Sequence, residues 1–162
     1  MMETYTHIIP SPVGPLTLRG TATAINVLSF KEGIIPEQGP LPDIFRLCTE
    51  ELEAYFAGSL RVFTFPMEQT GTAFQQTVWQ QLTAIPYAHT ISYLTLAKRI
   101  NNPGSIRAVG TTNGKNNLAI VVPCHRVIGS DGSLTGYGGG IWRKRWLLEH
   151  EMKHKYGSNL LF

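Results

Sequence analysis

Short apolar runs separated by turn residues fill the first part of the chain and predict a small sheet. The expected strands are Tyr5–Ile9, Leu16–Leu18 and Ile25–Phe30, with proline and glycine between them. Over residues 42–57 the apolar positions instead recur with a helical period, which predicts an amphipathic helix. Its apolar face is expected to consist of Ile44, Leu47, Cys48, Leu52, Tyr55 and Phe56.

Helical periodicity governs the next segment. An apolar stripe predicts a helix over Phe74, Val78, Trp79 and Leu82. Ser92 and Ser105 are suited to cap two short helices, 93–100 and 106–113, which a proline- and glycine-containing turn at 101–104 separates. Two short helices joined in this way are typical of a helix-turn-helix, whose second helix usually contacts DNA. Helical hairpins that bind no nucleic acid are also common, so this pattern leaves both interpretations open.

The last part of the chain combines an apolar run, a glycine-rich loop and a final helix. Leu118–Val122 has the length and composition of a strand, and six glycines lie among residues 129–140. The helix expected over 141–151 places Trp142, Trp146, Leu147 and His150 on one side. We therefore expect an α+β fold. A small N-terminal sheet with one helix would occupy residues 1–70, and a mostly helical domain with a winged-helix-like helix-turn-helix would occupy residues 71–162.

The composition is that of an ordinary globular protein. The chain has 162 residues, of which 43% are hydrophobic and 15% charged, and this balance excludes a disordered chain. No apolar run approaches the roughly 20 residues of a membrane-spanning helix. The first ten residues carry no Lys or Arg, so no secretory signal is expected. Only two cysteines occur, which excludes a disulfide framework and a Cys-x-x-Cys metal site and favours a cytoplasmic protein.

The net charge of +3 conceals a difference between the two halves. Residues 1–75 contain four basic and eight acidic groups, a balance of −4. Residues 76–162 contain ten basic and three acidic groups, a balance of +7. This asymmetry is compatible with a second half that faces a polyanion, and equally with an uneven surface that binds nothing.

The two cysteines lie in different surroundings. Cys48 falls on the apolar face of the first predicted helix, where a cysteine acts as a small hydrophobic residue. Cys124 follows an apolar run and a proline, and His125 and Arg126 follow it. Cationic neighbours lower the pKa of a thiol from about 8.5 and increase its thiolate fraction. The tetrapeptide is compatible with a reactive thiol, and also with a buried cysteine beside a solvated His-Arg pair.

Motifs in the second half resemble one protein family. The run Pro123–Gly129 is similar to the active-site signature of the O6-alkylguanine-DNA alkyltransferases, the methylated-DNA–protein-cysteine methyltransferases. Other motifs of that family follow in its order and spacing between residues 72 and 151, and two looser ones lie in the first half. The matching segments are Ser11–Leu16, Leu52–Gly58, Ile85–Tyr93, Arg107–Gly110, Asn116, Tyr137–Gly139 and Trp146–Glu151.

The resemblance implies an activity and a role for each reacting residue. The family flips O6-alkylguanine, and O4-alkylthymine, out of duplex DNA and transfers the alkyl group irreversibly to its own cysteine. Here Cys124 would be the acceptor, His125 the general base acting through a water, and Glu151 the carboxylate that orients the imidazole. Asn116 would brace the active-site turn, and Tyr93 would donate a hydrogen bond to N3 of the base. Taken singly, each residue also has an ordinary structural explanation.

Double-stranded DNA, bound through the minor groove with little sequence preference, is the partner that the resemblance implies. The expected DNA contacts are Tyr93, Arg107, Ala108, Gly110, Thr111, Lys115 and Arg126, with Arg107 filling the gap left by the flipped base. The expected pocket residues are Trp79, Val127, Tyr137, Gly138 and Gly139. Further candidates for phosphate contacts are Lys98, Arg99 and the run Arg143–Arg145, although that run is equally suited to a solvated helix face.

Three departures from the family pattern and two alternative functions accompany this assignment. Thr111 and Thr112 stand where the family often has Gly or Ala, Gly138 replaces a small Ser or Ala, and Ala88 replaces a frequent Gly. One alternative is a non-enzymatic lesion-binding protein of the alkyltransferase-like type, which lacks the cysteine that this chain has. The other is a helix-turn-helix regulator with a structural Cys124. We expect a cytoplasmic, nucleoid-associated monomer without cofactor, metal site or membrane contact.

Overall fold

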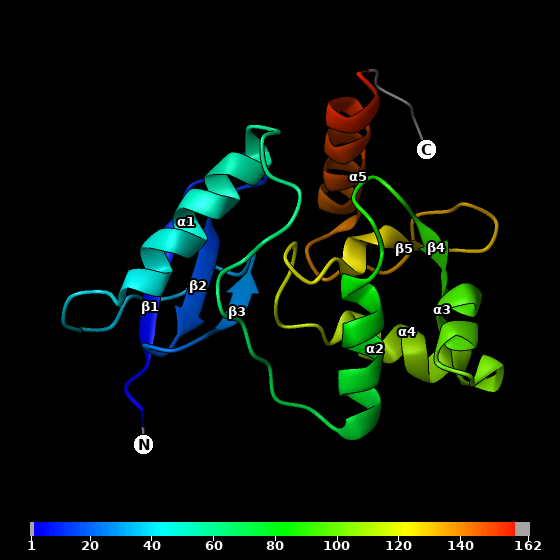
Figure 1. Cartoon of the computed structure of the whole chain (residues 1–162), viewed down its shortest axis with the longest axis horizontal. Helices are drawn as coiled ribbons and strands as arrows, with labels where there is room; N and C mark the ends of the chain where they lie inside the picture. The colour runs from blue at the N-terminus through cyan, green and yellow to red at the C-terminus, as the bar shows by residue number, and fades with distance from the viewer. Residues whose placement is uncertain (1, 158–162) are drawn as a thin grey trace. The chain divides into compact units, whose positions relative to one another are not determined.

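A computed structural model describes residues 2–157 of the chain, which folds into two compact units (Figure 1). The units comprise Met1–Gln69 and Thr70–Phe162, and each has its own core. Within residues 2–157, none of the helices has both the length and the apolar character required to span a bilayer. The expected order of a small sheet followed by a helical domain is confirmed.

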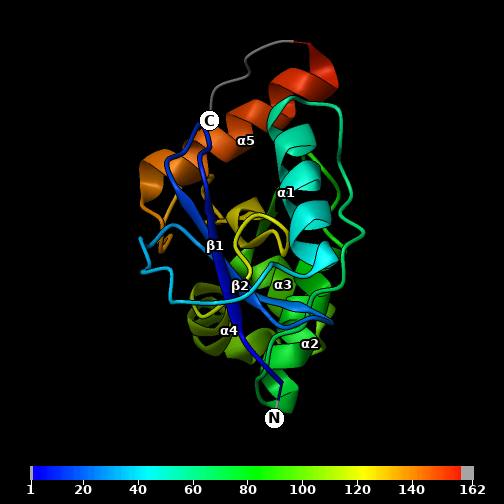
Figure 2. The same cartoon turned by 90° about the vertical axis from the view of Figure 1, so that its left-hand side faces the viewer.

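The N-terminal unit is an antiparallel sheet with one helix alongside it (Figures 1 and 2). Strands β1 (Tyr5–Ile9), β2 (Leu16–Gly20) and β3 (Ile25–Ser29) pair in sequence order, with a bulge between Arg19 and Gly20. Helix α1 (Asp43–Phe56) agrees with the helix predicted from periodicity. These strands and this helix confirm the elements expected for the first half, with small differences at their ends.

The buried face of α1 differs in part from the predicted stripe. Phe45 is buried and meets Tyr5 edge-on with ring centroids 6.2 Å apart, whereas Leu47 is 37% exposed. Glu51 is also buried, because its carboxylate accepts the backbone N–H groups of Thr64 and Phe65. Cys48 is fully buried, and burial raises the pKa of its thiol to about 12. It is therefore an inert core residue, as its position on the apolar face indicates.

The C-terminal unit is mostly helical, as expected. Its helices and strands are α2 (Ala73–Thr83), β4 (Ile91–Ser92), α3 (Tyr93–Arg99), α4 (Ile106–Gly114), β5 (Val127–Ile128) and α5 (Ile141–Tyr156). Strands β4 and β5 form a parallel pair that connects the start of α3 to the segment just after Cys124. Helix α5 continues beyond the predicted end at residue 151 and leaves Trp142 54% exposed.

Helices α3 and α4 form the predicted helix-turn-helix. Ser92 caps α3 as expected, since its hydroxyl accepts the N–H of Thr95 at 3.0 Å. Ser105 does not cap α4, because its hydroxyl donates to the Asn102 carbonyl at 2.6 Å in a short 3₁₀ turn, η1 (Pro103–Ser105). The turn residue Asn101 adopts a positive φ of 57°, a conformation that asparagine tolerates. The two helices are thus joined by a tight, internally bonded turn.

The apolar run before the cysteine is a buried turn and not the expected strand. Val122 donates its N–H to the carbonyl of Leu118 at 2.9 Å, and Val121 donates to that of Ala119 at 2.8 Å. Ile120 has a φ of 72°, which is rare for a β-branched residue. All five residues are buried, so burial explains the apolar composition although the backbone is folded back on itself.

Candidate active site

Cys124 opens a 3₁₀ turn, η2 (Cys124–Arg126), at the end of the strained buried turn. The residue is only 7% exposed. Asn116 holds the turn that precedes it, because its Nδ2 donates to the carbonyls of Val122 at 2.8 Å and Leu118 at 3.3 Å. Its Oδ1 accepts the N–H of Leu118 at 3.2 Å. One side chain therefore fixes the backbone that presents the thiol, and it does so on the turn where Ile120 has its unfavourable φ.

A buried carboxylate organises the residues around this turn. Glu151 on α5 is fully buried and accepts the Nε2 hydrogen of His125 at 2.7 Å. It also accepts two hydrogens of Arg126, from Nε at 2.9 Å and from the Nη2 nitrogen at 3.0 Å. The N–H of Ala88 donates to it at 3.0 Å, from a residue with a positive φ of 61°. Helix α5 is thereby joined to η2 and to the loop before β4.

The surroundings of His125 determine its protonation state. The ring is completely buried, and burial lowers the pKa of His125 although the contact with Glu151 opposes this shift. Burial would raise the pKa of Glu151, but His125 and Arg126 hold it below its usual range. The imidazole is therefore neutral beside an ionised carboxylate, with its hydrogen on Nε2. Among residues 2–157, nothing hydrogen-bonds to the buried Nδ1, which carries a lone pair that can accept a proton.

Arg126 requires a correction, because the expected DNA contact is a buried structural cation. Its Nε and one terminal nitrogen pair with Glu151, and the other terminal nitrogen donates to the Ile85 carbonyl at 2.8 Å. The guanidinium also lies 5.7 Å from the centre of the Tyr87 ring. A buried guanidinium whose donors are used internally is not available to a phosphate. Its position beside Glu151 explains how that carboxylate stays ionised without water.

Lys144 is a feature that the sequence did not reveal. It lies in the basic run proposed for phosphate contact or a solvated face, yet its side chain is completely buried. Its Nζ donates to the carbonyl of Val127 at 2.6 Å and to that of Thr135 at 2.9 Å. Burial lowers the pKa of Lys144 to about 8, although Cys124 opposes this shift. Lys144 therefore fastens the glycine-rich loop to β5 and places a cation near the thiol.

The buried ammonium predicts a pH dependence of stability. In the unfolded chain the pKa of Lys144 is 10.5, so between about pH 8 and this value the unfolded state binds more protons. The free energy of unfolding of the wild type should therefore rise through this interval relative to Lys144→Met, by about 3 kcal/mol. Denaturant unfolding at several pH values measures the difference, with Lys153→Met, an exposed position of the same helix, as control. A difference that does not change with pH would contradict a desolvated ammonium.

The thiol itself is not activated by its sequence neighbours. Burial raises the pKa of Cys124, while Asn116 and Lys144 act in the opposite direction. The sequence suggested that His125 and Arg126 would lower this pKa, but His125 is neutral and the charge of Arg126 is compensated by Glu151. The thiol is therefore protonated at neutral pH, and a reaction as a nucleophile requires a base to take its proton.

Two tyrosines expected at the site lie near Cys124. The pKa of Tyr93 is raised by burial, with Thr135 and Asn113 acting against this shift and Cys124 adding to it. The Tyr93 hydroxyl donates to the Thr135 carbonyl at 3.3 Å, the same carbonyl that Lys144 holds. Burial and the proximity of Cys124 raise the pKa of Tyr137 well above its usual range. The glycine-rich loop thus lies against both Tyr93 and Lys144.

The other expected pocket residues are placed as follows. Gly138 is exposed, and the Gly139 carbonyl accepts a hydrogen of Arg143 at 2.9 Å. Val127 is completely buried, and its carbonyl is engaged by Lys144. Trp79 is buried on α2, where its indole nitrogen donates to the Thr112 carbonyl at 3.1 Å. We therefore assign Trp79 to packing beneath α4 and not to a pocket wall.

Helix α4 presents a continuous exposed face. Arg107, Ala108, Thr111 and Lys115 are exposed, and Thr111 donates its hydroxyl to the Arg107 carbonyl at 3.1 Å. Gly110 lies over Tyr93, since a side-chain carbon added to it would sit 3.8 Å from the phenol ring. The face therefore combines two cations with small residues that allow close approach of another molecule.

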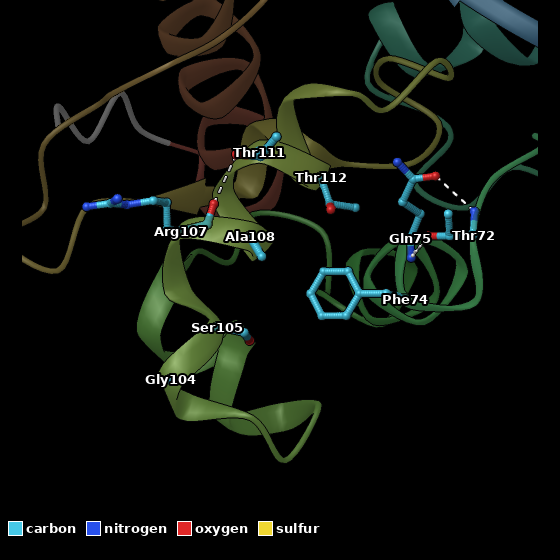
Figure 3. Close-up of a pocket in the computed structure, with 9 residues that line it drawn as sticks. All are labelled: Thr72, Phe74, Gln75, Gly104, Ser105, Arg107, Ala108, Thr111 and Thr112. Atoms are coloured by element: carbon cyan, nitrogen blue, oxygen red, sulfur yellow. Dashed lines mark hydrogen bonds between the residues drawn. The ribbon is translucent and has the colours of Figure 1, made fainter.

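An open groove of about 560 Å³ runs beside this face, between the starts of α2 and α4 (Figure 3). Figure 3 shows Phe74 and Ala108 on opposite sides of the groove, while the Arg107 side chain extends away from it. The lining residues are Thr72, Phe74, Gln75, Gly104, Ser105, Arg107, Ala108, Thr111 and Thr112. Cys124 does not line this groove. The groove therefore borders the exposed face of α4 and is separate from the turn η2 that contains Cys124.

Within the described part of the chain, no three histidine, cysteine, aspartate or glutamate side chains lie close enough to hold a metal ion. Cys124, His125 and Glu151 do not form such a group: Glu151 is engaged by His125, Arg126 and Ala88. The residues at this site are arranged for proton transfer and for reaction at sulfur.

Two family models match the chain. Residues 4–69 match the ribonuclease-like domain of 6-O-methylguanine DNA methyltransferase, and residues 73–153 match its DNA binding domain. The methylated-DNA–protein-cysteine methyltransferase of Mycobacterium bovis is 48% identical over 158 residues, which is 95% of this chain and 96% of that protein. The enzyme of the same name from Methanosarcina acetivorans is 43% identical over 154 residues, covering 91% of this chain and 97% of that protein.

Solved structures agree with these matches. Mycobacterium tuberculosis OGT in complex with DNA is 49% identical, with a TM-score of 0.85 over 92% of this chain and 93% of that one. The O6-methylguanine-DNA methyltransferase of Pyrococcus kodakaraensis is 26% identical, with a TM-score of 0.60 over 92% of this chain and 99% of that one. Together with the buried Cys124–His125–Glu151 arrangement, these matches show that the chain belongs to the 6-O-methylguanine DNA methyltransferase family.

Proposed function

We propose that this protein repairs DNA by transferring the alkyl group of O6-alkylguanine, and of O4-alkylthymine as a second substrate, to the Sγ atom of Cys124. The observation that carries the proposal is the neutral, buried His125, whose Nε2 hydrogen is held by Glu151. This arrangement leaves Nδ1 as a proton acceptor on the residue that follows a protonated thiol. The site therefore has both a nucleophile and the base that the nucleophile needs.

The proposed reaction is one in-line displacement. A water passes the Cys124 thiol proton to His125 Nδ1, and sulfur forms a bond to the alkyl carbon as the carbon–O6 bond breaks. The electron pair of that bond stays on the guanine, which takes up one proton, so the proton lost by the thiol is balanced. The Tyr93 phenol turns its hydrogen from the Thr135 carbonyl to N3 and so stabilises the charge on the departing base. The thioether has no comparable leaving group, so each molecule reacts once.

DNA is proposed to lie against the exposed face of α4, with the target base flipped toward Cys124. Unstacking and unpairing one base costs about a few kcal/mol, and we propose that Arg107 occupies the vacated space. Small residues at Ala108 and Gly110 favour close approach of α4 to a minor groove. Lys98, Arg99 and Lys115 are exposed and are proposed to contact phosphates. Such contacts carry no sequence information, so little sequence preference is expected.

We also propose that the protein acts as a monomer in the cytoplasm, at the nucleoid. All the residues assigned to the reaction and to DNA belong to one compact unit, so no second copy is needed to complete the site. A reducing compartment protects a reactive cysteine from oxidation. Sedimentation of the protein alone and with a short duplex measures the stoichiometry, and a 2:1 complex would contradict the monomer.

Mass spectrometry tests the proposed function directly. After incubation with a duplex containing O6-methylguanine, the peptide that contains Cys124 should gain the mass of one methylene group, and the peptide that contains Cys48 should not. Cys124→Ser should show no gain in mass. It should still bind the lesion, with similar affinity in duplexes of different sequence. An unmodified Cys124 in the wild type, despite tight binding of the lesion, would instead support a non-enzymatic lesion-binding protein.

A further inference from the structure

Asn113 is a buried amide at the inner side of α4. It is 3% exposed, whereas Thr111 on the same helix and Lys115 directly after the helix are exposed. Its Nδ2 donates to the carbonyl of Cys124 at 3.3 Å. Asn113 also acts on the phenol of Tyr93 through a hydrogen bond that lowers the pKa of that residue. The amide therefore lies between Cys124 and Tyr93, the tyrosine that we propose contacts the flipped guanine.

The oxygen of this amide is unused. Asn113 Oδ1 is buried and has no hydrogen-bond partner among the described residues. Asn116, three residues away, contrasts with it, because its nitrogen and its oxygen both bond to the turn before Cys124. A buried acceptor without a donor is unfavourable, because nothing compensates for the lost contact with water. The Asn113 nitrogen faces a carbonyl, which accepts but cannot donate, so the oxygen is the atom left to face a ligand.

The chemistry of the lesion defines what this oxygen can accept. Alkylation at O6 removes the hydrogen from N1 of guanine, so the 2-amino group is the only hydrogen-bond donor left on the base. This amino group is adjacent to N3, the acceptor assigned to the Tyr93 phenol. A donor at Tyr93 and an acceptor at Asn113 therefore match two neighbouring atoms of one base edge. O4-alkylthymine carries no donor and presents its O2 oxygen at this edge, where it would face a second acceptor.

We infer that Asn113 Oδ1 accepts a hydrogen bond from the 2-amino group of the flipped base and makes the site selective for guanine lesions over O4-alkylthymine. The inference rests on the proposed function and names a residue that determines the substrate preference of the same site. Tyr93 supplies the donor of the pair, and the Cys124 carbonyl keeps the Asn113 amide in its orientation. Asn113 is thus a specificity residue, and the proton and alkyl transfers use other groups.

Alkyl-transfer rates on three duplexes test the inference. They contain O6-methylguanine, O6-methylhypoxanthine, which is the same base without the 2-amino group, or O4-methylthymine. The wild type should react fastest with O6-methylguanine. In Asn113→Leu the preference for O6-methylguanine over each of the other two lesions should fall about tenfold, the value of one hydrogen bond. Asn113→Asp keeps an acceptor oxygen, so it should retain the preference even where its rates are lower.

Two controls make the outcome decisive. Asn26→Leu is the same substitution in the N-terminal unit, where the asparagine donates to the Glu68 carbonyl at 2.9 Å, and it should leave all three rates unchanged. Equal slowing of all three reactions in Asn113→Leu, with unchanged preference, would assign Asn113 to support of Cys124 and overturn the inference. A wild type that transfers no alkyl group would contradict the proposed function. The same two preferences, measured as ratios of dissociation constants for the three duplexes, would then still support or overturn the role of Asn113.

Discussion

His125→Gln is expected to slow alkyl transfer by about 10²–10⁴-fold, the usual contribution of a positioned general base. Glutamine can still donate a hydrogen to Glu151, as the imidazole does at 2.7 Å, so the buried contact is kept. It has no nitrogen that accepts a proton in place of Nδ1, and the thiol of Cys124 is protonated because burial raises its pKa. Single-turnover transfer from an O6-methylguanine duplex gives the rate of each protein.

The pH profile separates loss of the base from damage to the fold. Because burial lowers the pKa of His125 below 6.5, the wild-type rate should stay level as pH falls to this value and decrease only below it. In His125→Gln this acid limb should be absent. The same shift implies that the wild type loses stability as pH falls below 6.5, since the unfolded chain then binds a proton that the folded state excludes. An unchanged rate in His125→Gln would show that the imidazole is not the base.

Glu151→Gln is expected to produce the largest loss of stability, about 3–5 kcal/mol. In the wild type the Arg126 guanidinium donates two hydrogen bonds to the Glu151 carboxylate. The substitution leaves this buried guanidinium without a counter-charge. Glutamine also keeps only one acceptor oxygen, so it cannot accept all four hydrogens that His125, Arg126 and the N–H of Ala88 donate to the carboxylate. Denaturant unfolding measures the loss. Glu149→Gln, two residues earlier on α5 and outside this network, is the matched control and should change stability by less than about 0.5 kcal/mol.

Acid unfolding provides a second measurement on Glu151. His125 and Arg126 hold the pKa of Glu151 below its ordinary value of 4.5, so its contribution to stability is complete above that pH. The contribution is lost as pH falls through the folded-state pKa. Glu151→Gln should therefore unfold with a weaker dependence on pH in the acid range than the wild type. Identical acid unfolding of the two proteins would contradict a carboxylate that stays ionised in the folded state.

Local pattern predicted the elements whose signals lie within a few residues. Ser92 caps α3 because a serine side chain bonds the N–H three residues ahead, which is independent of the rest of the fold. Strands β1 to β3 and helix α1 follow from short-range alternation and helical period. The run Leu118–Val122 misled this reasoning, because five buried apolar residues look alike whether the backbone is extended or turned. The hydrogen bonds from Asn116 to Leu118 and Val122 hold this run in the turned conformation.

Sequence by itself indicated the family, because the family motifs depend on residue identities at fixed spacing, and the resemblance marked Cys124 as the expected acceptor. Only the tertiary structure decided which charged side chains are buried and which are exposed. Arg126 and Lys144 stand in basic segments that suit a solvated surface, yet both are buried. Glu151 lies 25 residues from Arg126 in the chain, and the Val127 carbonyl lies 17 residues from Lys144. Whether a cation faces water, a carboxylate or carbonyls depends on such long-range packing, which residue spacing does not encode.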